Sequence, residues 1–449
     1  MRRILSILDV LRKVRPKPMA DATSSSKSGS DCEGSGTPTS KQRINFNKKD
    51  NAGGKSSGPG NEVLWRNLRH VLNICEGQQK PPTIASRESD VEFGALVNVL
   101  EVQRFVSDVF AAMNVPLQAA SEMADALIAA DYMGQRSMGI HRLPSIASDL
   151  LNLRVDARMQ PKVLCEREAL ALVDGQNAPG PVVANFSMDL AMLKARDQGI
   201  GFVAARRSNN IGMASWYACQ ALAQRMIGLC LSNGLPILVP SGGIEPLLGD
   251  NCIACAAAST QEQFLVDIGM SAYPIQQLEL DYCNGYLQEL PPQLALDCNG
   301  HPTTSTAAAL RAQRLHPFTP EHKGFGVAAM VDILCGVMTG ARYASQLGRR
   351  GLFSLDQDMA DLGQVYIAID PMRFCVSFEE RLADFHQLLR NVLPCNPNQP
   401  PLIPGDKENQ HMQMVDDQGG LILSPCTLYV LQELSERFNI NPIKSNKKA

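Results

Sequence analysis

The sequence contains 449 residues, and its hydrophobic fraction of 45% is sufficient for a sizeable core divided among two or three domains. Its formal net charge of −3 argues against general nucleic-acid binding. No apolar run reaches the roughly 18 residues that a membrane-spanning helix needs. We therefore expect a globular, cytoplasmic protein with neither a nucleic acid nor a membrane as its partner.

The 13 cysteines are an odd number, and many lie in apolar segments such as Leu229-Cys230-Leu231. This pattern is typical of reduced, buried thiols in an intracellular protein rather than of a disulfide framework. Cys252 and Cys255 have the spacing of half a metal site, but no second pair accompanies them. We predict no metal site.

Residues 1–18 are basic and amphipathic at helical spacing, as in a mitochondrial transit peptide. Asp9 and the long Ser/Gly-rich continuation favour instead a helix on a disordered extension. We expect a basic, disordered tail over residues 1–61. A short helix and a linker follow over residues 62–95.

The folded part begins with helices. Apolar residues recur at helical spacing over 101–113, where Val102, Phe105 and Val109 share one face, and again over 116–132. A third helix is predicted over 145–153. Two packed helices therefore open the domain.

Beyond Arg158, strands and helices alternate. The pattern predicts strands over 169–174, 201–205, 226–231 and 264–268, and helices over 181–198 and 213–224. A looser segment over 276–320 is followed by a helix over 327–340, a strand over 364–370 and helices over 377–393 and 426–438. Gly199 is expected to cap the helix over 181–198 at its C-terminal end.

Two stretches suggest a phosphate contact. Residues 199–204 match the letters of the dinucleotide fingerprint G-x-G-x-x-A, but the order here is helix then strand, so we reject that interpretation. Residues 232–251 form a Pro- and Gly-rich loop after an apolar run. Its exposed backbone amides would bind an anionic ligand such as a pyrophosphate. The alternative is an ordinary surface loop.

Five separate stretches of the chain carry short motifs in a definite order and spacing. They are Arg-Arg-Ser-Asn-Asn-Ile-Gly at 206–212, the loop at 234–251, Lys-Gly-Phe-Gly at 323–326, Tyr-Ile-Ala-Ile-Asp-Pro at 366–371 and Pro-Gly-Asp at 404–406. Together they resemble the type 2 malate/L-lactate dehydrogenases, a family that includes ureidoglycolate and sulfolactate dehydrogenases and a cyclic-imine carboxylate reductase. The resemblance covers about residues 97–440.

The resemblance implies a mixed α/β fold. In this family a non-Rossmann nicotinamide-binding domain, with a mixed or antiparallel sheet, is inserted in a helical domain formed by both chain ends. The protein is expected to be a homodimer. The implied division is a first helical part over 96–165, the dinucleotide-binding domain over 166–324 and a second helical part over 325–445.

The resemblance also implies a nicotinamide cofactor, NAD or NADP. The family's cofactor positions match the loop residues Ser232, Asn233 and Gly234, the strand end Ile268, Gly269 and Met270, and Lys323. An apolar strand is implied at residues 252–255. Lys323 would meet a phosphate or a substrate carboxylate as a point charge; the alternative is a solvated lysine before a helix.

Oxidation of a small 2-hydroxy acid needs a cation for the carboxylate, a base for the hydroxyl proton and a nicotinamide ring to accept hydride. Arg142 matches the family's arginine and would grip the carboxylate bidentately, or form only a surface ion pair.

The proton acceptor is where the chain departs from the family. The family motif Asp-Ser-His-Gly here reads Arg136-Ser137-Met138-Gly139, and Ser-Asn-His-Phe-Gly reads as residues 208–212 with Asn210 in place of histidine. Asn210 hydrogen bonds but does not titrate near neutral pH, and a positioned base contributes roughly 10² to 10⁴ in rate.

Two residues are candidates to replace the missing base. His141 would share a helical face with Met138, three positions earlier, or else serve in packing. Lys323 would serve if burial lowered its pKa.

Two hypotheses follow. The first is an NAD(P)-dependent oxidoreductase for a small 2-hydroxy or 2-oxo acid with altered or weakened catalysis, in which Asn210 polarises the hydroxyl. The second is a pseudoenzyme that keeps the fold, and dinucleotide binding with it, and acts as an interaction or regulatory protein.

Overall fold

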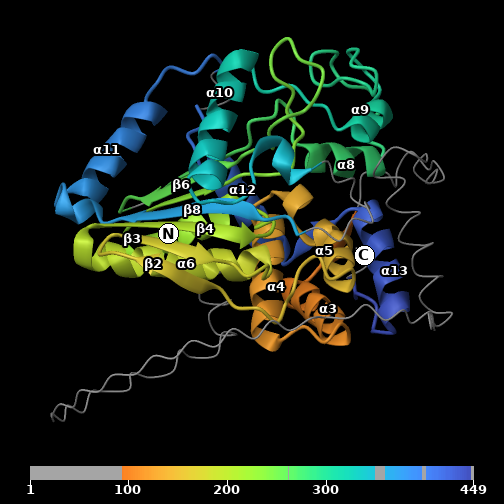
Figure 1. The fold of residues 1–449 in the computed structure, drawn as a ribbon, viewed down its shortest axis with the longest axis horizontal. Coiled ribbons are helices and arrows are strands. Elements are labelled where there is room, and N and C mark those ends of the chain that lie inside the picture. Colours follow the sequence, from red (N-terminus) through yellow and green to blue (C-terminus); the bar gives the residue numbers. More distant parts are fainter. Residues whose placement is uncertain (1–93, 261, 349–358, 397–400, 446–449) are drawn as a thin grey trace, which may run out of the picture.

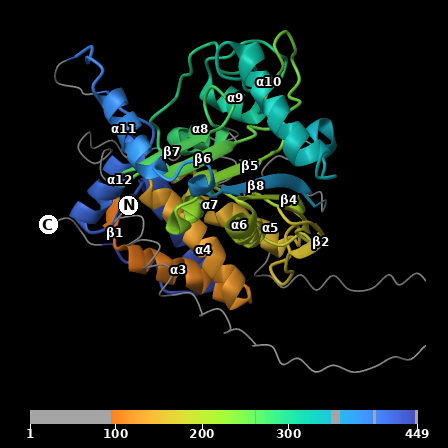
Figure 2. The same cartoon turned by 90° about the vertical axis from the view of Figure 1, so that its left-hand side faces the viewer.

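A seven-stranded sheet crosses the middle of the protein, with helices on both of its faces (Figures 1 and 2). The structure is a computed structural model that describes residues 94–260, 262–348, 359–396 and 401–445. The tail expected over residues 1–61, and the short helix and linker up to residue 93, lie outside the described residues.

The sheet is mixed, in the order β2-β3-β4-β8-β5-β6-β7. Only β3 and β4 are parallel among its neighbouring pairs. The mixed α/β fold class is therefore confirmed. The strands are β2 (Lys162–Glu166), β3 (Leu170–Asp174), β4 (Ile200–Ser208), β5 (Ile227–Ser232), β6 (Ile253–Ala258), β7 (Gln263–Ile268) and β8 (Leu362–Ile369).

One face of the sheet is covered by α6 (Gly180–Gln198) and α7 (Ala214–Gln220), with α4 (Leu117–Tyr132) beyond them (Figure 2). Most of the buried residues of α6 are alanine, valine or methionine. The helix lies close to β4, because a Cβ on Gly201 would lie 1.9 Å from the Ala191 carbonyl oxygen. Gly199 ends α6 with a φ of 81°, which confirms the expected cap. The other face carries α10 (Glu321–Asp332) and the π-helical turn η4 (Ile333–Val337).

Both ends of the described chain pack together. Strand β1 (Ala95–Val97) pairs antiparallel with β9 (Leu421–Leu423). Tyr132, at the end of α4, accepts a hydrogen bond at its carbonyl from His411 in α12. The remaining helices are α3 (Val99–Ala112), α5 (Leu143–Leu151), α8 (Ile275–Cys283), α9 (Thr306–Ala312), α11 (Phe378–Arg390), α12 (Asp406–Gln418) and α13 (Pro425–Phe438). Short 3-10 turns complete the set: η1 (Arg136–Met138), η2 (Ile140–Arg142), η3 (Ala221–Gln224), η5 (Ala344–Leu347) and η6 (Pro371–Arg373).

Several predicted elements are wrong in type or extent. The segment 276–320, expected to be loose, contains α8 and α9, and the helix predicted over 213–224 divides into α7 and η3. The α-helix predicted over 327–340 ends at Asp332 and continues as η4. Strand β2 and helix α12 have no counterpart among the predicted elements, because β2 is largely exposed and α12 is mostly polar. Neither has a long apolar pattern.

Strand β8, predicted over 364–370, lies in the range 325–445 that was assigned to the second helical part, and it occupies the centre of the sheet between β4 and β5. The two neighbours bond it on both edges over most of its length, with Tyr366 opposite both Val203 and Cys230. The range 325–445 therefore contributes a central strand to the sheet as well as helices. The domain boundaries themselves stay a prediction.

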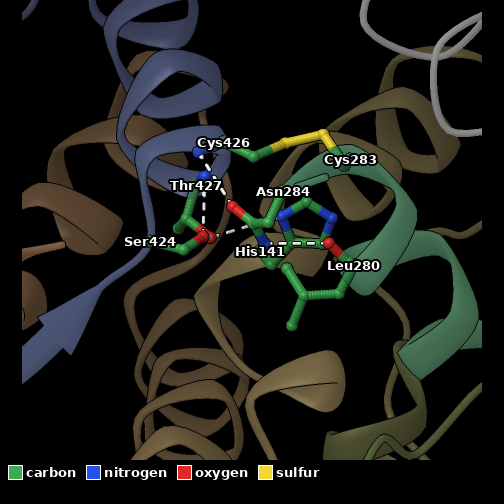
Figure 3. The surroundings of a disulfide bond; sticks show 7 residues. All are labelled: His141, Leu280, Cys283, Asn284, Ser424, Cys426 and Thr427. Carbon is green, nitrogen blue, oxygen red and sulfur yellow. Dashed lines mark hydrogen bonds between the residues drawn. A yellow bond between two sulfur atoms is a disulfide. The ribbon is translucent and has the colours of Figure 1, made fainter. Parts of the chain in front are cut away.

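The expectation of reduced thiols is wrong for one pair of cysteines. Cys283 at the end of α8 and Cys426 at the start of α13 form a disulfide, with their Cα atoms 6.0 Å apart (Figure 3). They are separated by 143 residues, so only the packing of α8 against α13 brings them within disulfide range. The other described cysteines are free thiols.

Candidate functional site

The turn that carries Ser137, Met138, His141 and Arg142 is held by Asp131. Asp131 lies buried in α4 and accepts a hydrogen bond at 2.7 Å from the backbone N–H of Ile140. A Cβ on Gly139 would lie 2.2 Å from the Asp131 carboxyl group, so only glycine allows this approach. Burial raises the pKa of Asp131 to about 7, and the backbone hydrogen bond and Arg136 oppose that rise. An acid titrating near neutrality therefore anchors the turn.

Gly139 divides this turn into η1 and η2, so Met138 and His141 do not share one helical face as predicted. Ser137 is buried, and Met138 is partly buried against the main hydrophobic core. His141 is buried, with its Nδ1 atom 3.4 Å from the Thr427 hydroxyl of α13 (Figure 3). Burial, assisted by neighbouring Arg142, lowers the pKa of His141 to about 3. A histidine with this pKa is a weak proton acceptor at neutral pH.

Arg142 forms an ion pair inside the protein. Its Nη1 atom lies 2.6 Å from Oε2 of Glu279 in α8. The Glu279 side chain is 5% exposed and the Arg142 side chain 20% exposed, so part of Arg142 stays accessible. Burial raises the pKa of Glu279, and Arg142 opposes that rise.

Asn210 follows strand β4 in an exposed turn. Its side-chain oxygen accepts a hydrogen bond at 2.7 Å from the N–H of Gly212. The turn is fixed from behind because the amide of Asn209 donates to the carbonyls of Asn177 and Ala178. The first residue of α6, Gly180, approaches so closely that a Cβ there would lie 2.0 Å from the Asn210 carbonyl oxygen.

Asp267, at the end of β7, joins three of the predicted segments. Its Oδ2 atom accepts from the backbone N–H of Ser215, 2.8 Å away, and from the Gln135 side chain, 3.4 Å away. Ile268 follows directly. The Ser137–Met138 turn, the start of α7 after Asn210 and the strand end 268–270 therefore meet at one carboxylate. Sequence reasoning noted Asp267 only as part of a strand end, since its partners are distant in sequence.

The loop after β5 is fixed by Asn233. This buried side chain donates to Asp332 Oδ1 at 3.1 Å and to the Arg342 carbonyl at 3.0 Å, and it accepts from the Gly363 N–H. The Ser232 hydroxyl donates to the Asn233 carbonyl. Both side chains are therefore occupied within the protein, and they hold the loop in place.

A second pair of polar residues connects this loop with the strand end. Asn251 accepts from the Gly234 N–H at 3.0 Å and donates to the Ala328 carbonyl of α10 at 2.8 Å. Its neighbour Asp250 accepts from the Ser271 N–H through its carboxylate and from the Met270 N–H through its carbonyl. The loop 232–234, the strand end 268–270 and the helix of Lys323 thus form one bonded unit.

The predicted cofactor residues divide by accessibility. Ser232, Asn233 and Met270 are buried, Gly234 and Gly269 are partly exposed, Ile268 is 47% exposed, and Lys323 is exposed in the first turn of α10. Gly326, one turn after Lys323, has open space where a Cβ would point. An exposed cation beside an open helix face fits an anionic cofactor group.

Comparison with known proteins identifies the family. The family model for malate/L-lactate dehydrogenase matches residues 97–431. The chain belongs to this family. A malate dehydrogenase of Pyrococcus horikoshii is 36% identical over 256 residues, which cover 55% of this chain and 71% of the relative. An L-sulfolactate dehydrogenase of Methanothermobacter thermautotrophicus is 32% identical over 313 residues, covering 70% of this chain and 89% of the relative.

The solved structure of the Pyrococcus horikoshii malate dehydrogenase matches with a TM-score of 0.70 at 28% identity and covers 81% of this chain and 100% of that one. Family and relatives support a hydroxy-acid dehydrogenase, and the family typically uses a nicotinamide cofactor.

Among the described residues, the helices are all too short or too polar to span a bilayer. Residues 252–255 overlap strand β6, and burial raises the pKa of both Cys252 and Cys255.

The raised pKa of Asp131 predicts how stability depends on pH. Because the folded protein holds this proton more tightly than the unfolded chain, the stability it contributes falls as pH rises from about 4 to about 7. Asp131→Asn keeps an acceptor for Ile140 and cannot ionise. The melting temperature of the variant minus that of wild type should therefore rise between about pH 5 and about pH 8, and the corresponding difference in the free energy of unfolding has a limit of about 4 kcal/mol. A constant difference across this range would contradict the assignment.

Proposed function

We propose that the protein is an NAD(P)-dependent oxidoreductase for a small 2-hydroxy or 2-oxo acid, with weakened catalysis. One observation carries this proposal: hydrogen bonds connect the segments that contain the positions matched to cofactor and substrate contacts. Asp267 connects the turns near Ser137 and Asn210 with the strand end, and Asn251 connects the loop after β5 with α10. A site kept together in this way supports retained binding.

In this proposal Lys323 meets a cofactor phosphate, and Gly234, Ile268 and Gly269 provide the accessible contacts beside it. The nicotinamide, when bound, supplies the hydride-accepting chemistry. Ser232, Asn233 and Met270 act indirectly, because they are buried and fix the loop and the strand end. Arg142 keeps an accessible part with which to hold the substrate carboxylate.

Proton transfer is the weak step. Asn210 hydrogen bonds to a substrate hydroxyl without taking its proton, and the Met138 thioether is only a weak acceptor. His141 does not compensate, because burial keeps its pKa at about 3 and the ring contacts Thr427. We therefore expect turnover below that of a site with a positioned base by roughly 10² to 10⁴.

The second candidate is a pseudoenzyme with the same fold. It is favoured by the ion pair between Arg142 and Glu279, which already engages Nη1 of the cation that the first candidate assigns to the substrate carboxylate. In that case cofactor binding persists and the chain acts as an interaction or regulatory subunit. Turnover separates the two candidates.

We also propose that the protein is located in the cytoplasm, with mitochondria as the alternative if residues 1–18 act as a transit peptide. We further propose that it is a homodimer. Helix α11 projects from the edge of the molecule in both views (Figures 1 and 2). Phe385 is 48% exposed, Leu388 61% and Leu393 91%. Clustered apolar side chains of this size favour coverage by a second copy.

Removal of the Lys323 charge tests cofactor binding. Lys323→Ala should weaken NADH or NADPH binding about 10- to 100-fold, because a charge-assisted hydrogen bond contributes about 1.5 to 3 kcal/mol. Fluorescence titration measures the dissociation constants. Lys407→Ala is the matched control, since Lys407 is also exposed in the first turn of a helix, α12. Equal effects of the two substitutions would contradict the role of Lys323.

Restoration of the imidazole tests the catalytic part. Asn210→His, alone or with Met138→His, should raise kcat/KM for lactate or malate by about 10²-fold. The oxidation rate should then increase with pH through about 6.5, as a histidine base loses its proton. Asn210→Gln is the control that cannot titrate. Cofactor binding with no turnover in any variant would support the pseudoenzyme instead.

The α11 surface tests the homodimer. Phe385→Glu with Leu388→Glu should raise the dimer dissociation constant by at least about 30-fold, because a central interface residue contributes about 2 kcal/mol or more. Light scattering after size-exclusion chromatography measures the mass. Gln387→Glu, on the same helix, is the charge control. A dimer that survives the double substitution would place the interface elsewhere.

A further inference from the structure

Glu279 is the one carboxylate that contacts the Arg142 guanidinium among the described residues. The 2.6 Å contact engages Nη1 and leaves the other guanidinium N–H groups for a ligand. Because the Glu279 side chain is only 5% exposed, solvent screens this pair weakly. The cation that would hold a substrate is therefore balanced by a fixed negative charge.

Both partners lie on firmly held elements. Helix α8 is tied to α13 by the disulfide Cys283–Cys426 and by the Asn284 side chain, which accepts from the Cys426 N–H and donates to the Leu280 carbonyl (Figure 3). On the other side, Asp131 holds η2 through Ile140. A ligand cannot easily displace Glu279 from Arg142, since α8 has little freedom to move.

We propose that Glu279 determines substrate specificity by orienting Arg142 and limiting the acid to a single carboxylate. The free guanidinium edge accepts one carboxylate through directed hydrogen bonds. A second carboxylate on the same small acid would lie within several Å of the Glu279 charge, where like charges repel. This inference rests on the proposed function and narrows its substrate class to monocarboxylic 2-hydroxy and 2-oxo acids.

Lactate and malate provide a test, because malate carries the additional carboxylate. Calorimetric titration, with and without saturating NADH or NADPH, should show that the wild-type protein binds L-lactate more tightly than L-malate. Glu279→Gln retains an acceptor for Arg142 but removes the charge. It should lower the dissociation constant of malate relative to that of lactate by at least about tenfold.

Glu289→Gln is the matched control, because it removes one carboxylate charge ten residues after Glu279. Glu289 is exposed and has no side-chain partner among the described residues. It should leave the ratio unchanged. Glu279→Ala removes both the charge and the acceptor. It should weaken lactate binding, which separates orientation from charge.

Two results would overturn the inference: a wild-type preference for malate, or an unchanged ratio in Glu279→Gln. The first needs no variant, so the test stands even if a substitution prevents folding. If NADH binds but neither acid binds to the wild-type protein or to any variant, the inference is also overturned. The cofactor-binding part of the proposed function would then still hold. Absence of cofactor binding alone rejects the proposed function, and the acid titrations still test Glu279.

Discussion

The arrangement of the site depends on one shared carboxylate. Asp267 accepts from Ser215 and Gln135, and so it holds together a turn from the first helical region, the start of α7 and the end of β7. Burial raises its pKa, and the hydrogen bonds from Ser215 and Gln135 oppose that rise. A partly buried carboxylate is stabilised by donors, and here the donors come from segments far apart in the chain. These hydrogen bonds connect the three segments.

The same constraint explains how charge is distributed around Arg142. A partly buried guanidinium is costly without a partner, and Glu279 provides one within the protein. Glu279 belongs to α8, which the disulfide and Asn284 fix to α13. Stability and recognition are therefore coupled at this position, because the group that balances the cation also faces whatever acid approaches it.

Patterning along the chain was sufficient for the regular elements of the core. Helices α3 and α4 appear within two residues of their predicted bounds, because their apolar residues repeat at helical spacing and are buried. The strands β3, β4, β5, β7 and β8 are apolar runs at the places predicted. Motif resemblance supplied the mixed sheet, which is a matter of strand order and lies beyond local periodicity. The failures, α8, α9, β2 and α12, are short, polar or exposed segments.

The sequence by itself determined the family, the principal helices and strands, and the identity of residues such as Met138, Asn210 and Lys323, because these depend on local pattern and motif order. Only the tertiary structure decided that β8 lies at the centre of the sheet, that Cys283 meets Cys426, and that Glu279 pairs with Arg142. These contacts join residues more than 100 positions apart. No local preference encodes them, since they depend on which buried surfaces and polar groups satisfy one another in the folded chain.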